Sequence, residues 1–206
     1  MNWSCCLLLS GVSGTDETSW CTLFWFRAAV CTPKLQRVPF LDRWKVPSPG
    51  WFKINTDAAL DSSRCKVGLG VVVRESYGLV LLSGSLVLDG LFSPKVAEAL
   101  AILRGVQLAL DSSFNPFCIE SDAASVVHLI SSRTNSFADI GLVVDDIILF
   151  LDRLPDFSIF AIRRSVNKVA HKLARFALGL VSYSIWLEDF PSCISSLVSD
   201  DIRDSL

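Results

Sequence analysis

The sequence predicts an α/β domain in which a mixed five-stranded sheet, begun by three antiparallel strands, is flanked by helices. One observation is a change of hydrophobic period, from strand-like alternation over residues 51–88 to helical spacing after residue 93. A second is the order of elements beyond that point, where helices alternate with short apolar strands. A third is the hydrophobic content of 51% in 206 residues. It is enough for a substantial buried core.

Three strands joined by short turns form the first half of the predicted domain. They are expected at 51–60 (WFKINTDAAL), at 66–76 and at 79–88, and their short connections are typical of an antiparallel meander. Gly68 and Gly70 lie inside the second strand. Glycine within a strand often marks a point where another backbone approaches closely.

Helices dominate the second half. Ser93 and Pro94 form a cap and first-turn pair that predicts the start of a helix over 96–113. One face of this helix carries Glu98 together with small residues, which would let it lie close to a sheet. The remaining elements are expected at 117–122 (strand), 123–132 and 137–153 (helices), 157–164 (strand) and 166–180 (helix).

The composition of successive segments predicts how the chain is organised. Residues 1–43 show no clear period and are expected to be poorly structured, and the Pro- and Gly-containing stretch 44–50 is expected to be a linker. The domain proper is then 51–190, and 191–206 is expected to be a C-terminal tail.

The charge and cysteine content exclude several classes of protein. A formal net charge of −2 argues against coating of nucleic acid by bulk charge, so any such site must be local. Seven cysteines without a C-x-x-C pair, and only two histidines, argue against a zinc site and favour a reducing, intracellular compartment, nucleus or cytoplasm. No run of 18 apolar residues occurs, so we expect no membrane partner. We expect a monomer.

Three acidic residues occupy positions that could converge. Asp57 lies near the end of the first strand, Glu98 in the first long helix and Asp122 at the end of the fourth strand. Each alone has a simpler interpretation, as a turn-forming, solvated or helix-capping acid. If the two strands are neighbours, however, the three carboxylates share one pocket and need cations to tolerate one another's charge. Oxygen-only ligands select Mg²⁺ or Mn²⁺, and the expected chemistry is phosphodiester hydrolysis with two ions.

Residues 44–190 resemble the ribonuclease H-like domain common in plant genomes, a retrotransposon-derived type associated with reverse transcriptases. The resemblance is carried by WFKINTDAAL (51–60), GLGVVVRESYGLVLLSGS (68–85), AEALAILRGVQLAL (97–110), IESDAASVVHLI (119–130), NKVAHKLARFAL (167–178) and WLEDFP (186–191). It implies a ribonuclease H-like fold that cleaves the RNA strand of RNA–DNA hybrids. It also implies that Asp57, Glu98 and Asp122 are the first three metal-binding carboxylates.

The fourth position departs from the family pattern. Active members usually place an Asp near the start of the last helix, whereas this chain has His171 there. Either His171 belongs to the catalytic set and weakens the hold on the water-activating ion, because imidazole is a poorer ligand for Mg²⁺, or it is only a half-exposed helix residue. Two functions therefore stay open, a metal-dependent hybrid endoribonuclease and a domesticated nucleic-acid-binding module with weak or no activity.

A basic segment precedes and includes the last predicted helix. Residues 161–175 contain no acid and five basic residues: Arg163, Arg164, Lys168, Lys172 and Arg175. By the family arrangement this segment lies beside the active site and would hold phosphates of a hybrid without sequence preference. The alternative interpretation is an ordinary solvated helix face.

Overall fold

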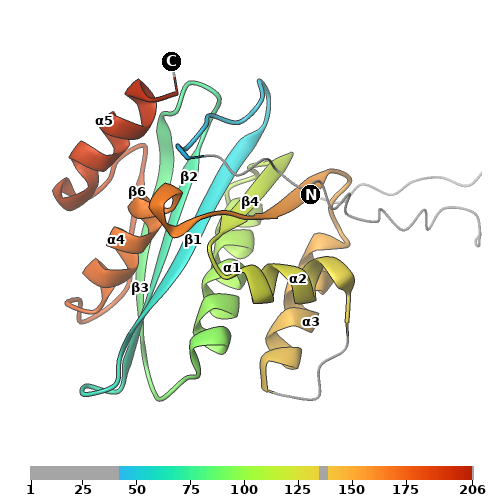
Figure 1. Ribbon diagram of the computed structural model, residues 1–206, viewed down its shortest axis with the longest axis vertical. Coiled ribbons are helices and arrows are strands. Elements are labelled where there is room, and N and C mark those ends of the chain that lie inside the picture. Colours follow the sequence, from blue (N-terminus) through green and yellow to red (C-terminus); the bar gives the residue numbers. More distant parts are fainter. Residues whose placement is uncertain (1–41, 135–138, 206) are drawn as a thin grey trace, which may run out of the picture. The chain divides into compact units, whose positions relative to one another are not determined.

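The computed structural model describes residues 42–134 and 139–205, and it contains a mixed sheet of six strands (Figure 1). The strands are β1 (Phe52–Asp61), β2 (Lys66–Arg74), β3 (Val80–Asp89), β4 (Phe117–Ser121), β5 (Phe157–Ala161) and β6 (Ser184–Leu187), in the order β5-β4-β1-β2-β3-β6. β1, β4 and β5 are parallel to one another, and the remaining pairs are antiparallel. The predicted fold class is confirmed, with one strand more than expected.

Helices cover both faces of this sheet (Figure 1). The long helices are α1 (Pro94–Asp111), α2 (Ala124–Ser132), α3 (Asp139–Leu151), α4 (Lys168–Ala177) and α5 (Ser195–Arg203), with short 3-10 turns η1 (Arg164–Val166) and η2 (Ser192–Ile194). α1 packs on β1 and β2 and contacts α2 and α3, while α4 packs on β1, β2 and β3 and contacts α5. Val71 faces α1 and its neighbour Gly70 faces α4, so the two helices lie on opposite faces.

Two glycines of β2 allow α4 to lie directly on the sheet. A Cβ at Gly68 would overlap the carbonyl oxygen of Ala174, and a Cβ at Gly70 would overlap the carbonyl oxygen of Ala170. The close backbone approach predicted from these glycines is therefore confirmed. It sets how near the side chains of α4 come to β1.

The sixth strand is a correction to the predicted count of five. β6 is short and pairs with the edge strand β3, with Trp186 opposite Ser83. Its side chains alternate between half-buried and exposed, because successive side chains of a strand point to opposite faces of the sheet. Four residues with such a weak apolar signal fall below what a period of two can reveal.

The segments flanking the predicted domain also contribute to the packed structure. Most of 1–43 lies outside the described residues. Trp44, in the expected linker 44–50, is buried and donates from Nε1 to Asn55 Oδ1 at 3.1 Å. The expected tail 191–206 contains α5, and Ile194 and Val198 are buried in one cluster with Val72 of β2. The apolar spacing in 191–206 thus forms a packed helix, not a tail.

Candidate functional site

The sheet brings two of the three predicted acids to the same edge. β1 and β4 are adjacent and parallel, their last paired residues are Thr56 and Ser121, and Asp57 and Asp122 follow directly. α1 supplies Glu98 from the face that covers β1. One carboxylate oxygen from each of the three acids lies within 4.8 Å of the others. The three predicted ligands therefore meet in one place.

Burial and mutual repulsion oppose the ionisation of two of these acids. Asp57 is 1% exposed. Burial, together with the charge of Asp122, raises the pKa of Asp57 to about 6, although the hydrogen bond and charge of His171 act in the opposite direction. Burial, with the charges of Asp57 and Asp122, raises the pKa of Glu98 to about 8. A cation between the acids would relieve this repulsion.

Two carboxylate oxygens at this point have no protein partner in the described part of the chain. They are Asp57 Oδ1 and Glu98 Oε2, and both are buried. Buried carboxylate oxygens are normally satisfied by a donor or a cation. Crowded, unpartnered oxygens are the donor set that Mg²⁺ and Mn²⁺ prefer, so Asp57, Glu98 and Asp122 fit a hard divalent ion.

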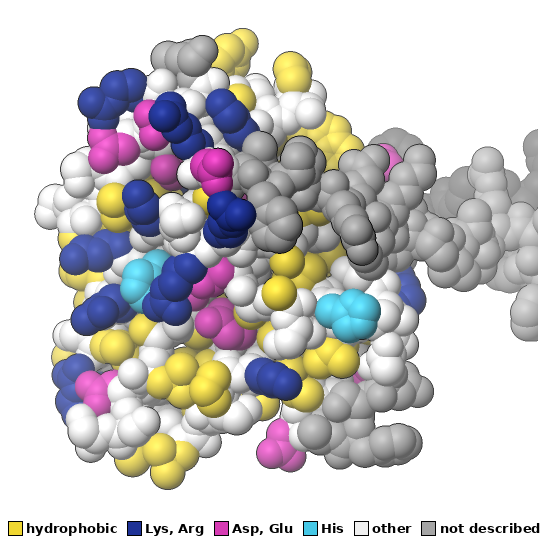
Figure 2. Space-filling model, viewed as in Figure 1, with side chains coloured by type: hydrophobic (Ala, Val, Ile, Leu, Met, Phe, Trp, Pro, Cys, Tyr) yellow, Lys and Arg dark blue, Asp and Glu magenta, His cyan; other side chains and the backbone are white. Residues whose placement is uncertain are grey.

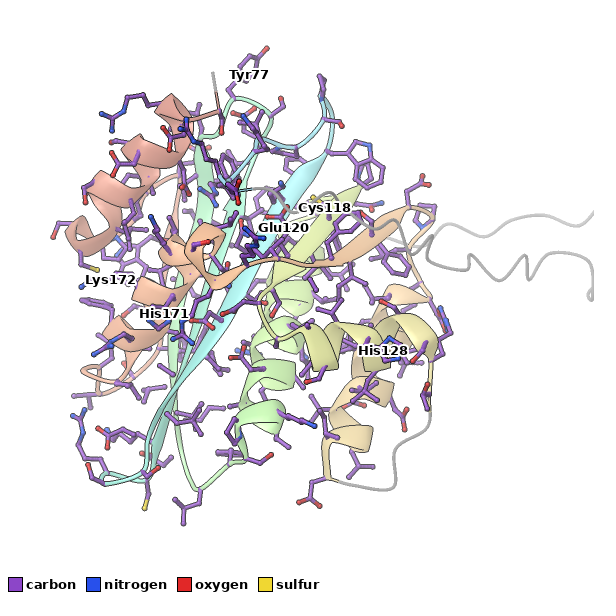
Figure 3. The ribbon with its side chains drawn as sticks, viewed as in Figure 1. Tyr77, Cys118, Glu120, His128, His171 and Lys172 are labelled. Atoms are coloured by element: carbon purple, nitrogen blue, oxygen red, sulfur yellow. The ribbon has the colours of Figure 1, made fainter. Side chains whose placement is uncertain are left out.

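His171 lies against this acidic cluster. Its Nδ1 is 2.6 Å from Asp57 Oδ2, and its side chain is 26% exposed. Figure 3 shows His171 on the side of α4 that faces the sheet, whereas Lys172 points away from it. His171 is thus a partly exposed helix residue that also contacts one of the three acids.

Asn167 contacts the same cluster, and sequence reasoning missed it. This residue precedes α4, is 1% exposed, and donates from Nδ2 to the Thr56 carbonyl oxygen at 2.9 Å and to Asp122 Oδ1 at 3.1 Å. The only sequence signal is that asparagine is common just before a helix. That signal points to a local cap, not to a contact with distant strands.

One of the predicted basic residues, Arg164, reaches the edge of the acidic cluster through His171. Arg163, Arg164, Lys168, Lys172 and Arg175 are all exposed. Lys168, Lys172 and Arg175 are spaced four and three residues apart on α4, so they share one helix face. Figure 2 shows Lys and Arg side chains gathered over this part of the surface, next to acidic side chains. Arg163 pairs with Asp42 at 2.6 Å, and Arg164 Nη2 lies 3.2 Å from His171 Nδ1. A phosphate backbone could reach the acids past these cations.

A buried polar network ties the strands together just before the acids. Glu120, two residues before Asp122, accepts from Lys53 Nζ at 2.6 Å and from Asn55 Nδ2 at 2.9 Å. Asn55, two residues before Asp57, accepts in turn from Arg74 Nη2 at 2.9 Å. In each of these contacts a hydrogen-bond donor meets an acceptor. The contacts between Glu120 of β4 and the side chains of β1 therefore stabilise the register of β1 on β4 next to the site.

None of the helices in the described ranges is both long enough and apolar enough to span a bilayer.

Sequence comparison finds an Arabidopsis thaliana protein described as a ribonuclease H protein, which is 26% identical over 168 residues. That alignment covers 80% of this chain but only 26% of the relative, so the chain corresponds to about a quarter of that protein's length.

Solved structures with a similar fold are ribonucleases H. The RNase H1 of the halophilic archaeon Halobacterium salinarum has a TM-score of 0.58 and 21% identity, over 62% of this chain and 97% of that one. The N-terminal RNase H domain of a Mycobacterium tuberculosis protein has a TM-score of 0.57 and 20% identity, over 62% and 93%. An RNase H1 isolated from compost, crystallised with an RNA/DNA hybrid, has a TM-score of 0.52 and 17% identity, over 62% and 99%. At these identities the likeness establishes the fold.

The family itself is established by a profile match. The sequence matches the family described as reverse transcriptase-like over residues 55–177, which is more than half of the chain and includes Asp57, Glu98, Asp122 and His171. This match confirms the resemblance seen in the motifs. The chain therefore belongs to the reverse transcriptase-like family of ribonuclease H-like domains.

Proposed function

We propose that this protein is a ribonuclease H-type enzyme that cleaves the RNA strand of RNA–DNA hybrids with the help of Mg²⁺ or Mn²⁺. The observation that carries the proposal is the meeting of Asp57, Glu98 and Asp122, whose ligand oxygens lie within 4.8 Å of one another. The family match and the RNase H1 that was crystallised with an RNA/DNA hybrid support the choice of substrate.

In this proposal the three acids hold the ions and the basic helix holds the substrate. The ligands are all oxygens, and we expect two ions. When bound, they would supply charge neutralisation at the acids and polarise the scissile phosphodiester and the attacking water. Lys168, Lys172 and Arg175 would bind phosphates along α4, with Arg163 and Arg164 at its start. These interactions position the duplex without reading its sequence.

The direct test is cleavage of a labelled RNA–DNA hybrid by the full chain, in Mg²⁺ and separately in Mn²⁺. The parent protein should cut the RNA strand, and Asp57→Asn should lower the rate by at least about 10³-fold, because the substitution removes a ligand together with its charge. Arg153→Gln is the matched control, since Arg153 is exposed at the end of α3 and contacts the Phe150 ring. Cleavage that survives in Asp57→Asn at the parent rate would contradict the proposal.

A second function is favoured by one specific observation, the imidazole of His171 at the position where active relatives carry an Asp. In this alternative the domain binds hybrids through α4 but turns over slowly or not at all. Tight binding of hybrid by the parent, without cleavage in either metal, would support this alternative over the enzyme.

A His171→Asp variant separates the two functions further. It places a fourth carboxylate beside Asp57, where His171 Nδ1 now lies 2.6 Å from Oδ2. We expect faster cleavage in Mg²⁺, by about tenfold or more, because the added charge strengthens the hold on the ion. An unchanged or lower rate would show that this position has no metal-binding potential.

A further inference from the structure

Two side chains, one just before α4 and one in its first turn, contact two of the three acids. Asn167 Nδ2 lies 3.1 Å from Asp122 Oδ1, and His171 Nδ1 lies 2.6 Å from Asp57 Oδ2. The two residues are four apart in sequence, which places them one above the other on the same side of the helix. Asn167 and the first turn of α4 therefore together touch the ends of both β1 and β4.

The neighbours of Asn167 fix the orientation of its amide. Its nitrogen faces the Thr56 carbonyl oxygen at 2.9 Å as well as the Asp122 carboxylate, and both of these groups only accept hydrogen bonds. A flipped amide would set oxygen against two oxygens at a buried position. Asn167 is therefore a donor to Asp122, and it joins that carboxylate to the backbone of β1.

The contact with Asp57 indicates which ring nitrogen of His171 donates. At neutral pH the Asp57 carboxylate accepts, so Nδ1 must carry the hydrogen. Arg164 Nη2 lies 3.2 Å from Nδ1 and 3.3 Å from Nε2, so this contact does not distinguish the two ring nitrogens. Through Nδ1, His171 presents a donor, not a ligand lone pair, to Asp57.

We propose that Asn167 and His171 are positioning residues of the metal centre, each holding one oxygen of a ligand carboxylate. This inference rests on the proposed function. His171 engages Asp57 Oδ2 and so leaves Oδ1, which is buried and without a partner among the described residues, for the ion. At this position α4 thus orients the Asp57 carboxylate through His171, whereas active relatives carry a fourth carboxylate there. Removing hydrogen-bond partners of this kind changes metal affinity by about 10- to 100-fold.

The test is Mn²⁺ binding by the full chain without nucleic acid, measured by calorimetry. In His171→Asn the side-chain nitrogen stays at the δ position, as in Nδ1 of the histidine. In His171→Gln the side-chain nitrogen lies one bond farther out, at the ε position. We expect the Kd for Mn²⁺ to stay within about threefold in His171→Asn and to rise about tenfold or more in His171→Gln and His171→Ala. Arg153→Gln serves as the control, with the Kd of the parent.

Asn167→Ala gives an independent arm, with a rise in Kd of about tenfold expected if the thermal transition shows that it folds. If it does not fold, the three His171 variants decide, because that side chain is partly exposed. A Kd in His171→Ala that equals or falls below that of the parent would overturn the inference, since the imidazole would then be idle or competing with the ion. Absence of Mn²⁺ binding by the parent would overturn the proposed function as well, so the two failures are distinguishable.

Discussion

Asp57 and Glu98 are placed so that folding opposes their ionisation. Burial and neighbouring charges raise their pKa values from 3.8 to about 6 and from 4.5 to about 8. The folded chain therefore binds more protons than the unfolded chain between about pH 4 and pH 8. Without metal, the contribution of these groups to the free energy of unfolding falls as the pH rises through that interval and is constant above it. Without metal, the site therefore lowers the free energy of unfolding most at the pH where its ionised acids would bind a cation best.

Asp57→Asn should accordingly stabilise the metal-free protein at pH 8. The substitution removes a buried charge whose raised pKa corresponds to about 3 kcal/mol. The gain should vanish near pH 4, where Asp57 is protonated in the folded protein. Chemical denaturation in EDTA at both pH values measures the difference. Added Mg²⁺ should stabilise the parent more than the variant. A stability difference that does not change with pH would contradict the assigned pKa shift.

At the scale of elements, the position of α4 decides the geometry of the site. Gly68 and Gly70 allow its backbone to touch β2, and this close packing brings His171 to Asp57 and Asn167 to Asp122. A side chain at either glycine could not be accommodated without moving the helix. A shift of the helix by even about 1 Å would break both hydrogen bonds.

Gly70→Ala should therefore damage both stability and the site. Its Cβ would overlap backbone atoms of Ala170 and Ala174, which cannot rotate away as a side chain can. We expect a decrease of about 1–3 kcal/mol or more in unfolding free energy, and weaker Mn²⁺ binding. Gly84→Ala is the matched control, because its Cβ would be 3.4 Å from the flexible Leu108 side chain. Equal denaturation midpoints for the two variants would show that α4 is not tightly packed.

The elements also mark what the sequence can and cannot predict. The sequence predicts β1 at 51–60 and the strand occurs at Phe52–Asp61, because its alternation is strong and local. The convergence of the acids follows once the first and fourth strands are taken as neighbours. Asn167 is missed because its partners Thr56 and Asp122 are 111 and 45 residues away. Interactions at that separation leave no trace in a local pattern.

At the scale of the whole described chain, the segments before and after the predicted domain 51–190 both pack against Arg74. This guanidinium is 1% exposed, lies 3.5 Å from the centre of the Trp44 ring, and pairs with Asp201 of α5 at 2.7 Å. Ser205 Oγ donates to the Trp44 carbonyl oxygen at 3.0 Å. Described residues on both sides of the predicted domain 51–190 therefore contribute to the packing around Arg74.

Asp201→Ala should be strongly destabilising. It leaves the Arg74 charge buried without its carboxylate partner, and removing one member of a buried pair costs about 3–5 kcal/mol. Asp200→Ala is the matched control, because Asp200 pairs with Arg203 on the exposed side of the same helix. That surface pair should contribute no more than about 1 kcal/mol. The shift in denaturation midpoint measures both. Similar shifts for the two variants would contradict a stabilising role for the buried Arg74 pair.

The distribution of charge gives a prediction for the whole molecule bound to its proposed substrate. The formal net charge is −2, so affinity for a polyanion must come from the local cations of α4. Replacing Lys168, Lys172 and Arg175 with Gln should raise the Kd for hybrid. It should also reduce the slope of log K against log salt by up to about 2–3, because each phosphate that a cation neutralises adds close to one unit to the slope.

The control variant neutralises three cations elsewhere, at Lys66, Arg153 and Arg203. It changes net charge by the same amount, so a general electrostatic effect would flatten its salt slope equally. A local interface predicts instead that only the α4 variant changes slope, with KM rising while kcat stays close to the parent value, because these cations bind the duplex and do not contact the acids. Identical slopes for the two variants would leave α4 as an ordinary solvated helix face.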